Sequence, residues 1–259
     1  MPPAFLRTPP ALQTLLASFR LAWAFAWTAA CSPLAVLGAL FGTGSPSRHA
    51  KLTARVALFW AKGVLFGFGV RVVRKGPLPP RGAFISSNHL SHLDILVLAS
   101  LYPTNFVAKA EVSKWPVMGW LSKLGATVFI DRNNRNDTPR VIQRVSDLMS
   151  AGVTMTVFVE GYCGDGTKLL PFKRSLFKVP ASGGHPVVPM ALYYDSADAP
   201  WVGEISLIAH IFRMMSRRLN TVTVCIGEPI HSDDRRELAF SAEAKAKELF
   251  VPSAWEQSQ

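Results

Sequence analysis

Residues 83–94 read AFISSNHLSHLD, and they are followed by the uninterrupted apolar run 95–99. The apolar start, residues 83–87, predicts a short strand, and residues 95–99 predict the beginning of a helix. Two side chains suited to proton transfer, His89 and Asp94, lie at the polar turn between them. Positions five apart point in different directions around a helix, so these side chains can meet only if His89 lies at or before the helix start. In that arrangement Asp94 holds one imidazole nitrogen while the other faces a substrate.

The same turn also has interpretations without catalysis. A histidine and an aspartate at this spacing arise by chance in many sequences. Asn88 or Ser91 can serve only to cap the helix, and His92 can be an ordinary surface residue. Support for a catalytic interpretation must therefore come from the rest of the chain.

The composition indicates a chain that meets a membrane. Of its 259 residues 49% are hydrophobic, and the mean hydropathy of +0.21 is high for a soluble protein. The formal net charge is +11, and no acidic residue precedes Asp94, whereas ten lysines and arginines do. A basic half can bind nucleic acid, but this half is strongly apolar and contains Trp23, Trp27 and Trp60. The composition therefore favours an anionic membrane surface as partner, and no nucleic acid.

The longest uncharged stretch, residues 21–42, has the length needed to cross a bilayer. Pro33 interrupts it, which predicts either a kinked span or a re-entrant pair of short helices. A cleaved signal peptide is disfavoured because the stretch is long and begins late, and lipoprotein-type cleavage before Cys31 is disfavoured because the stretch continues past it. Positive charges flank both ends, so charge does not predict the orientation.

A second N-terminal segment, residues 51–73, is mostly apolar, with Lys51, Arg55 and Lys62 on one helical face. This pattern predicts a basic helix lying in the membrane interface, and the alternative is a helix packed on the catalytic domain. Three parts of the chain are predicted: membrane-associated helices over 1–72, a catalytic domain over 73–230, and a C-terminal helix and tail over 231–259.

Beyond these segments, short apolar runs alternate with helical patterns, which predicts an α/β fold. One helix is predicted to be capped by Asp137 or Thr138, with Pro139 in its first turn and Gly152 at its end. Further strands are predicted over residues 70–73, 105–109, 126–130, 154–159, 187–191 and 221–226, and another helix over 117–124.

Polar side chains follow three of the predicted strands where each strand ends, namely His89, Arg132 and Glu160. Ligands bind at the carboxyl ends of strands in open α/β sheets, so this coincidence across three strands supports a functional site. The cysteines, Cys31, Cys163 and Cys225, show neither metal-binding spacing nor a paired framework, so no metal is predicted.

Four blocks in this order resemble the glycerolipid acyltransferase family, whose best-known members are the 1-acylglycerol-3-phosphate acyltransferases. The blocks are NHLSHLD at 88–94, GATVFIDR at 125–132, VFVEG at 157–161 and VVPM at 187–190. The resemblance covers residues 70–229, and it implies a mixed sheet flanked by helices, preceded by an N-terminal membrane-associated helical segment.

The resemblance implies an O-acyltransferase bound to a membrane, at the cytoplasmic face of a bacterial-type inner membrane. It would transfer a fatty acyl group from acyl-CoA or an acyl carrier protein to a lysolipid acceptor, most simply 1-acyl-sn-glycerol-3-phosphate. His89 would be the general base on the acceptor hydroxyl, and Asp94 would orient it. A thioester is already activated, so one base and a shielded oxyanion are sufficient, and no cofactor is expected.

The family's other roles carry over by position. Arg132, together with Lys109, would hold the acceptor headgroup. Glu160 and Gly161 would shape the acceptor site, and Pro189 would help form the acyl-donor side. A salt bridge to Asp131 or another acid is the alternative use of Arg132.

Several residues depart from the family pattern. Val159 replaces a usual proline, and Tyr162-Cys163 replaces a usual Thr-Arg, so an arginine that often grips phosphate is missing. The segment 165–173 resembles the branch that acylates lyso-ornithine lipids, and the missing arginine predicts weaker discrimination for a phosphate monoester unless Lys168, Lys173 or Arg174 compensates. The alternatives are a lyso-ornithine lipid O-acyltransferase, a catalytically weak lipid-binding relative, and a thiol hydrolase that uses Cys163.

Overall fold

The computed structural model describes residues 10–134 and 136–252, which contain one seven-stranded sheet in the order β1-β7-β6-β2-β5-β3-β4. The strands β6, β2, β5, β3 and β4 run parallel, while β7 is antiparallel to β6 and parallel to β1 at the edge. The predicted mixed α/β sheet is therefore confirmed. Its strands are β1 (Val70–Lys75), β2 (Phe84–Ser87), β3 (Asn105–Lys109), β4 (Val128–Ile130), β5 (Met155–Phe158), β6 (Val187–Tyr194) and β7 (Asn220–Ile226).

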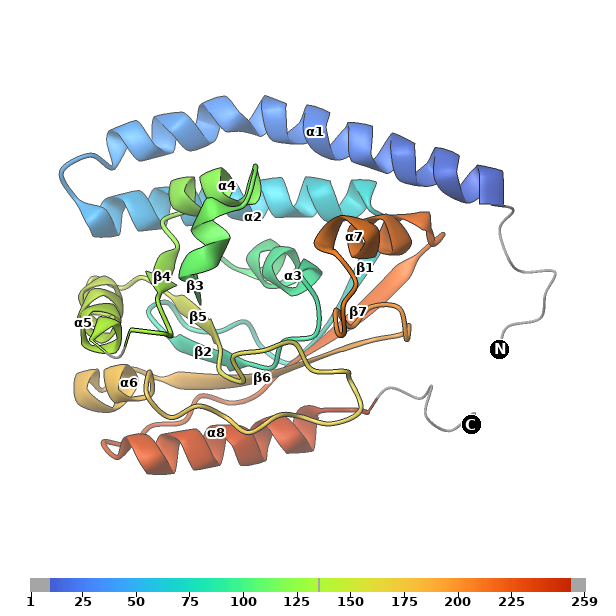
Figure 1. Cartoon of the computed structure of the whole chain (residues 1–259). Coiled ribbons are helices and arrows are strands. Elements are labelled where there is room, and N and C mark those ends of the chain that lie inside the picture. The colour runs from blue at the N-terminus through green and yellow to red at the C-terminus, as the bar shows by residue number, and fades with distance from the viewer. Residues whose placement is uncertain (1–9, 135, 253–259) are drawn as a thin grey trace.

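Helices cover both faces of the sheet (Figure 1). One layer contains α2, α3 and α7, with α1 outside it, and the other contains α5, α6 and α8. The helices are α1 (Pro10–Phe41), α2 (Pro46–Gly67), α3 (Leu93–Leu101), α4 (Met118–Leu124), α5 (Asp137–Ser150), α6 (Lys178–Gly183), α7 (Leu207–Ser216) and α8 (Arg235–Leu249), with a short 3-10 turn, η2 (Ala110–Lys114).

The central strand β2 is buried on both faces, which its unbroken apolar start requires. Successive side chains of a strand point to opposite faces, so Phe84 packs with α5 and α8 residues while Ile85 packs with α2 and α3 residues. The strand therefore ends, at Ser87, between two filled cores. This fixes where the polar turn that follows it can lie.

The N-terminal apolar stretch is one continuous helix, α1, that passes through Pro33 without breaking. It is long and apolar enough to cross a membrane by length and composition. The re-entrant pair of short helices is therefore wrong. α1 runs lengthwise along α2 on the outside of the molecule (Figure 1).

Tryptophans of α1 fit against glycines of α2. A Cβ at Gly67 would overlap the indole of Trp23, and a Cβ at Gly63 would overlap that of Trp27. Trp23 Nε1 donates to Gly63 O at 2.8 Å, and Trp60 Nε1 donates to Thr28 Oγ1 at 3.0 Å. These indoles join two helices.

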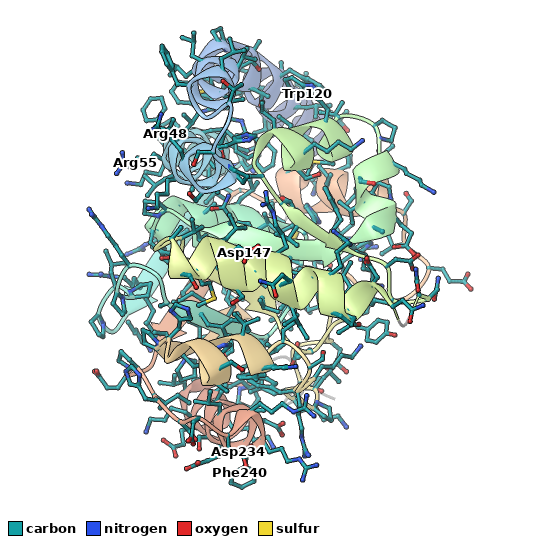
Figure 2. The ribbon with its side chains drawn as sticks, turned by 90° about the vertical axis from the view of Figure 1, so that its left-hand side faces the viewer. Arg48, Arg55, Trp120, Asp147, Asp234 and Phe240 are labelled. Carbon is teal, nitrogen blue, oxygen red and sulfur yellow. The ribbon has the colours of Figure 1, made fainter. Side chains whose placement is uncertain are left out.

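α2 is a packed helix, as the alternative interpretation had it. Its residues Ala61, Val64 and Leu65 are buried, in one core with α3. Its cations Arg48 and Arg55 remain exposed at the rim of this layer (Figure 2).

A buried arginine connects α1 to the far end of the chain. Arg20 is 6% exposed, and its guanidinium donates to Met215 O and Arg218 O, both at 2.8 Å, and to Arg217 O. These carbonyls lie at the C-terminus of α7, where backbone acceptors lack helical partners and favour a cation. Arg20 therefore caps α7 while it holds α1 in place.

The C-terminal helix belongs to the domain. α8 buries Leu238, Ala239, Ala242 and Ala246 in the same core as α5 and β5. The sheet begins at Val70, three residues before the predicted domain boundary.

Candidate functional site

The turn after β2 is held by an amide side chain that reaches a neighbouring strand. Asn88 is buried, its Nδ2 donates to Leu192 O at 2.9 Å, and its Oδ1 accepts from Leu192 N at 2.7 Å. The two bonds mimic a pair of strand hydrogen bonds just past the end of β2. The next residue, His89, therefore leaves the sheet at a fixed point.

His89 precedes α3 and Asp94 lies in its first turn, which is the arrangement that the spacing required. Asp94 is fully buried, and its Oδ2 accepts from His89 Nδ1 at 2.8 Å, Leu90 N at 2.6 Å and Ser91 N at 2.9 Å. Asp94 Oδ1 accepts from the hydroxyl of Tyr194 at 2.6 Å. Four donors thus compensate the burial of one carboxylate, because an ionised group without partners would be strongly unfavourable there.

The His89 ring is fixed on a second side by an aromatic residue. The imidazole stacks on Phe158 with a centroid distance of 4.0 Å and an interplanar angle of 15°. The side chain keeps 19% of its surface exposed, although Asp94 keeps none. One face of the ring and Nδ1 are therefore occupied by protein, and Nε2 is the nitrogen not bound to Asp94, on a ring that the Cys163 thiol also approaches.

Opposing influences act on the pKa of His89. Burial lowers it, but the hydrogen bond to Asp94 and an interaction with the Cys163 thiol raise it more, so the pKa lies above the ordinary histidine range. An imidazole in this setting holds a proton firmly once it has accepted one. Such a ring is a stronger base than an isolated histidine.

Glu160 supports the same turn from the end of β5. It is 3% exposed, its Oε2 accepts from His89 N at 2.9 Å, and its Oε1 accepts from Leu170 N at 2.7 Å. Burial raises the pKa of Glu160 to about 7, although both backbone donors oppose this rise. Both carboxylate oxygens already serve the backbone, so Glu160 shapes the site by holding His89 and the loop that contains Leu170.

Three cations meet around one tyrosine next to this turn. Lys173 Nζ lies 4.4 Å, Lys109 Nζ 4.8 Å and Arg132 Cζ 5.7 Å from the centroid of the Tyr162 ring. Among the described residues no carboxylate forms a salt bridge with any of the three. We call this set, Lys109, Arg132 and Lys173, the cation cluster.

Gly161 makes room for the cation cluster. Its φ of 82° is unfavourable for residues with a side chain, and a Cβ there would meet Lys173 Nζ. Arg132 Nη1 donates to Gly161 O, so the alternative salt bridge to Asp131 is not how Arg132 is used. Lys173 reaches the cluster because its backbone N donates to Val159 O at 2.9 Å.

The structure thus brings His89, Asp94, Glu160, Gly161, Arg132 and Lys109 to one edge of the sheet. It does not bring Pro189 there, since Pro189 is buried within β6, pairs with Ser86 of β2, and accepts from Gly227 N at 2.9 Å. The role of Pro189 on the donor side stays a prediction. In residues 10–134 and 136–252 no group of three or more His, Cys, Asp or Glu side chains is placed to hold a metal ion.

The sequence alone does not single out Phe158 or Tyr194, and it leaves Lys173 as one of three candidate cations. Phe158 and Tyr194 read as ordinary core residues of apolar strands, and nothing local marks them. For Lys173 the signal was its position in a basic loop, but only the fold separates it from Lys168 and Arg174.

Comparison with known proteins agrees with this geometry. A family model described as Acyltransferase matches residues 69–193. A 1-acyl-sn-glycerol-3-phosphate acyltransferase of Neisseria gonorrhoeae is 31% identical over 230 residues, which cover 83% of this chain and 90% of that one. A lyso-ornithine lipid O-acyltransferase of Pseudomonas aeruginosa is 31% identical over 199 residues, which cover 74% and 77%.

The fold also has a solved counterpart. The crystal structure of the 1-acyl-sn-glycerophosphate acyltransferase from Thermotoga maritima matches with a TM-score of 0.69 at 20% identity, over 95% of this chain and 96% of that one. At this identity the match supports the fold, including the N-terminal helices.

Proposed function

Because the chain belongs to the acyltransferase family, we propose that it transfers a fatty acyl group from a thioester to the free hydroxyl of a lysolipid in membrane lipid synthesis. His89 Nε2 takes the proton of the hydroxyl, and the oxygen attacks the thioester carbonyl carbon. The new C–O bond forms, the C–S bond breaks, and the imidazolium returns the proton to the departing thiolate. The chemistry needs no cofactor, and acyl-CoA or an acyl carrier protein supplies the acyl group.

One observation supports this proposal most strongly. A fully buried Asp94 binds Nδ1 of a histidine whose ring remains partly exposed, and a cluster of three cations, without a salt bridge among the described residues, lies at the same edge of the sheet. A base beside a site for an anionic headgroup is what O-acylation of an anionic lysolipid requires, so this arrangement supports the proposal.

The experiment uses purified full-length protein in detergent with an acyl thioester and a panel of lysolipids, and it identifies products by mass. Transfer predicts an acylated lipid and thiol release that depends on the lysolipid. If thiol is released even without a lysolipid, and Cys163→Ala abolishes this release, the protein is a thiol hydrolase. If the lysolipid binds but no acylated product forms, the protein is the catalytically weak relative.

For the acceptor we propose a phosphate monoester, as in 1-acyl-sn-glycerol-3-phosphate. Three cations that form no salt bridge among the described residues, with Glu111 as the one acid that acts on Arg132, favour a dianion. An ornithine headgroup is zwitterionic, with one carboxylate and one ammonium, so it offers three cations less net negative charge than a phosphate monoester does. Lys173 occupies the space beside Gly161 and takes over the charge that the missing arginine at position 163 would have supplied.

Lys173→Met is expected to raise KM for lysophosphatidate about ten- to a hundredfold, because it removes one charge-assisted hydrogen bond to phosphate. The ratio of kcat/KM for lysophosphatidate over a lyso-ornithine lipid should fall by a similar factor. Lys168→Met is the matched control, since Lys168 is exposed beside Asp165 and outside the cluster. Equal effects of the two variants, or a preference for lyso-ornithine lipid in the unmodified protein, would contradict the proposed acceptor.

We also propose that the outer face of α1 binds the membrane, at the cytoplasmic side where acyl thioesters are available. Its inner face packs on α2, so its outward apolar side chains are exposed in the part of the chain that the structure describes, and the exposed cations of α2 flank it (Figure 2). The exposed large apolar residues of α1 are Leu12, Leu15, Phe19, Leu21, Phe25, Leu34, Val36, Leu37, Leu40 and Phe41.

The double variant Phe19→Asp, Phe25→Asp is expected to move most of the protein from membrane to supernatant in a vesicle flotation assay. Charged groups in the hydrocarbon region are costly, and both side chains face outward. Phe240→Asp is the control, because Phe240 is 73% exposed on α8, at the opposite end of the molecule (Figure 2). Unchanged flotation of the double variant would contradict the assignment of this face.

A further inference from the structure

We propose that Tyr194 is a positioning residue for acyl transfer. It fixes the Asp94 carboxylate, which in turn orients the imidazole of the base His89 and adjusts its basicity. The inference rests on the proposed function, in which His89 is the base. It concerns a residue 100 positions away in sequence from Asp94, at the end of β6.

The geometry divides the two oxygens of Asp94 between two tasks. Oδ2 accepts the imidazole N–H at 2.8 Å and two backbone N–H groups of the turn. Oδ1 accepts the hydroxyl of Tyr194 at 2.6 Å, and the two side chains are 0% and 2% exposed. A carboxylate turns about its Cβ–Cγ bond, so a donor on Oδ1 fixes the plane in which Oδ2 meets His89.

The phenol is suited to this task because it stays protonated. Burial and the nearby charge of Asp94 both raise the pKa of Tyr194 well above the ordinary tyrosine value, so the hydroxyl remains a donor. Its proton draws negative charge away from Asp94. The carboxylate therefore stabilises the imidazolium less than it would alone, which keeps the pKa of His89 from rising further.

Other titratable groups face the same dyad. Glu160 comes from the end of β5, Cys163 from the following loop, and His92 from the start of α3. None of these donates to Asp94 Oδ1, where Tyr194 is bound. Removing the Tyr194 hydroxyl therefore changes one interaction of the dyad and leaves these groups in place.

The test is Tyr194→Phe, which keeps the buried ring and deletes only the hydroxyl. We expect kcat to fall roughly tenfold or more, because a hydrogen bond to a charged group is lost, with KM for thioester and lysolipid nearly unchanged. Activity on the acid side rises with pH as His89 loses its proton. Without the hydroxyl the pKa of His89 increases, so the acid limb of the kcat/KM profile should move to higher pH.

Tyr193→Phe is the matched control, because the neighbouring hydroxyl accepts from Lys75 at the surface, at 3.1 Å. If Tyr194→Phe behaves like Tyr193→Phe in rate and pH profile, Tyr194 is only a core residue and the inference is overturned. In that case inactivity of His89→Ala would leave the proposed function standing.

A second variant covers the case in which Tyr194→Phe does not fold. Site-specific 3-fluorotyrosine at position 194 makes the phenol a stronger donor at almost the same volume. It should lower the pKa of His89 and move the acid limb to lower pH, opposite to the effect of Tyr194→Phe. An acid limb that stays in place would overturn the inference.

Discussion

His89→Ala is expected to lower acyl transfer by about 10²–10⁴-fold, because the general base is removed while the rest of the site remains. The change should leave the fold intact. The ring is partly exposed, and the backbone of the turn is held by Glu160 and Asn88, which do not depend on the imidazole. The loss should appear in kcat, since the side chain acts on the reacting hydroxyl and not on the headgroup.

The measurement is product formation by mass, at a lysolipid concentration well above KM, beside a circular-dichroism melt in the same detergent. His231→Ala is the control, since His231 is exposed in the loop before α8. A folded His89→Ala protein with turnover like that of His231→Ala would exclude His89 as the base.

Asp94→Ala is expected to cost both activity and stability. Truncation removes the acceptor of Leu90 N, Ser91 N and the Tyr194 hydroxyl within a fully buried site, where unpaired donors are unfavourable. We expect a loss of about 3–5 kcal/mol in the free energy of unfolding, the range for breaking a buried charged pair. Transfer should fall nearly as far as in His89→Ala, because the ring loses its orientation.

Urea unfolding in detergent would measure the first effect and the transfer assay the second. Asp147→Ala provides the comparison, because Asp147 is exposed on the outer face of α5 (Figure 2). The interpretation is wrong if Asp94→Ala unfolds at the same urea concentration as Asp147→Ala, or if it retains transfer.

Much of the catalytic edge follows from local sequence. The polar turn lies between an apolar strand and an apolar helix. The five-residue spacing of His89 and Asp94 requires His89 to lie at or before the start of that helix. Strand β3 begins and ends at the predicted residues 105 and 109, since a clear apolar run and a terminal lysine bound it. Lys109, Arg132 and Glu160 share an edge because parallel strands bring their carboxyl ends together.

The roles that could not be predicted depend on contacts between distant segments. Tyr194 and Phe158 are chemically like any aromatic residue of a buried strand, and only the register of the sheet places them beside Asp94 and His89. The contacts of the α1 tryptophans with glycines of α2 could not be predicted, because a glycine surface cannot be recognised before the two helices are aligned. Composition shows that these tryptophans are apolar, but it does not show which residues they contact.

The contacts that Arg20 makes at the C-terminus of α7 constrain the order in which the protein can fold during synthesis. Its acceptors are 195 to 198 residues further along the chain. The ribosome adds residues at about 5–20 per second, so roughly 10–40 s pass between the synthesis of Arg20 and the synthesis of its acceptors. The edge strand β1 likewise cannot pair until its neighbour β7 has been synthesised. The contacts of Arg20 with the end of α7 can therefore form only after nearly the whole chain has been synthesised.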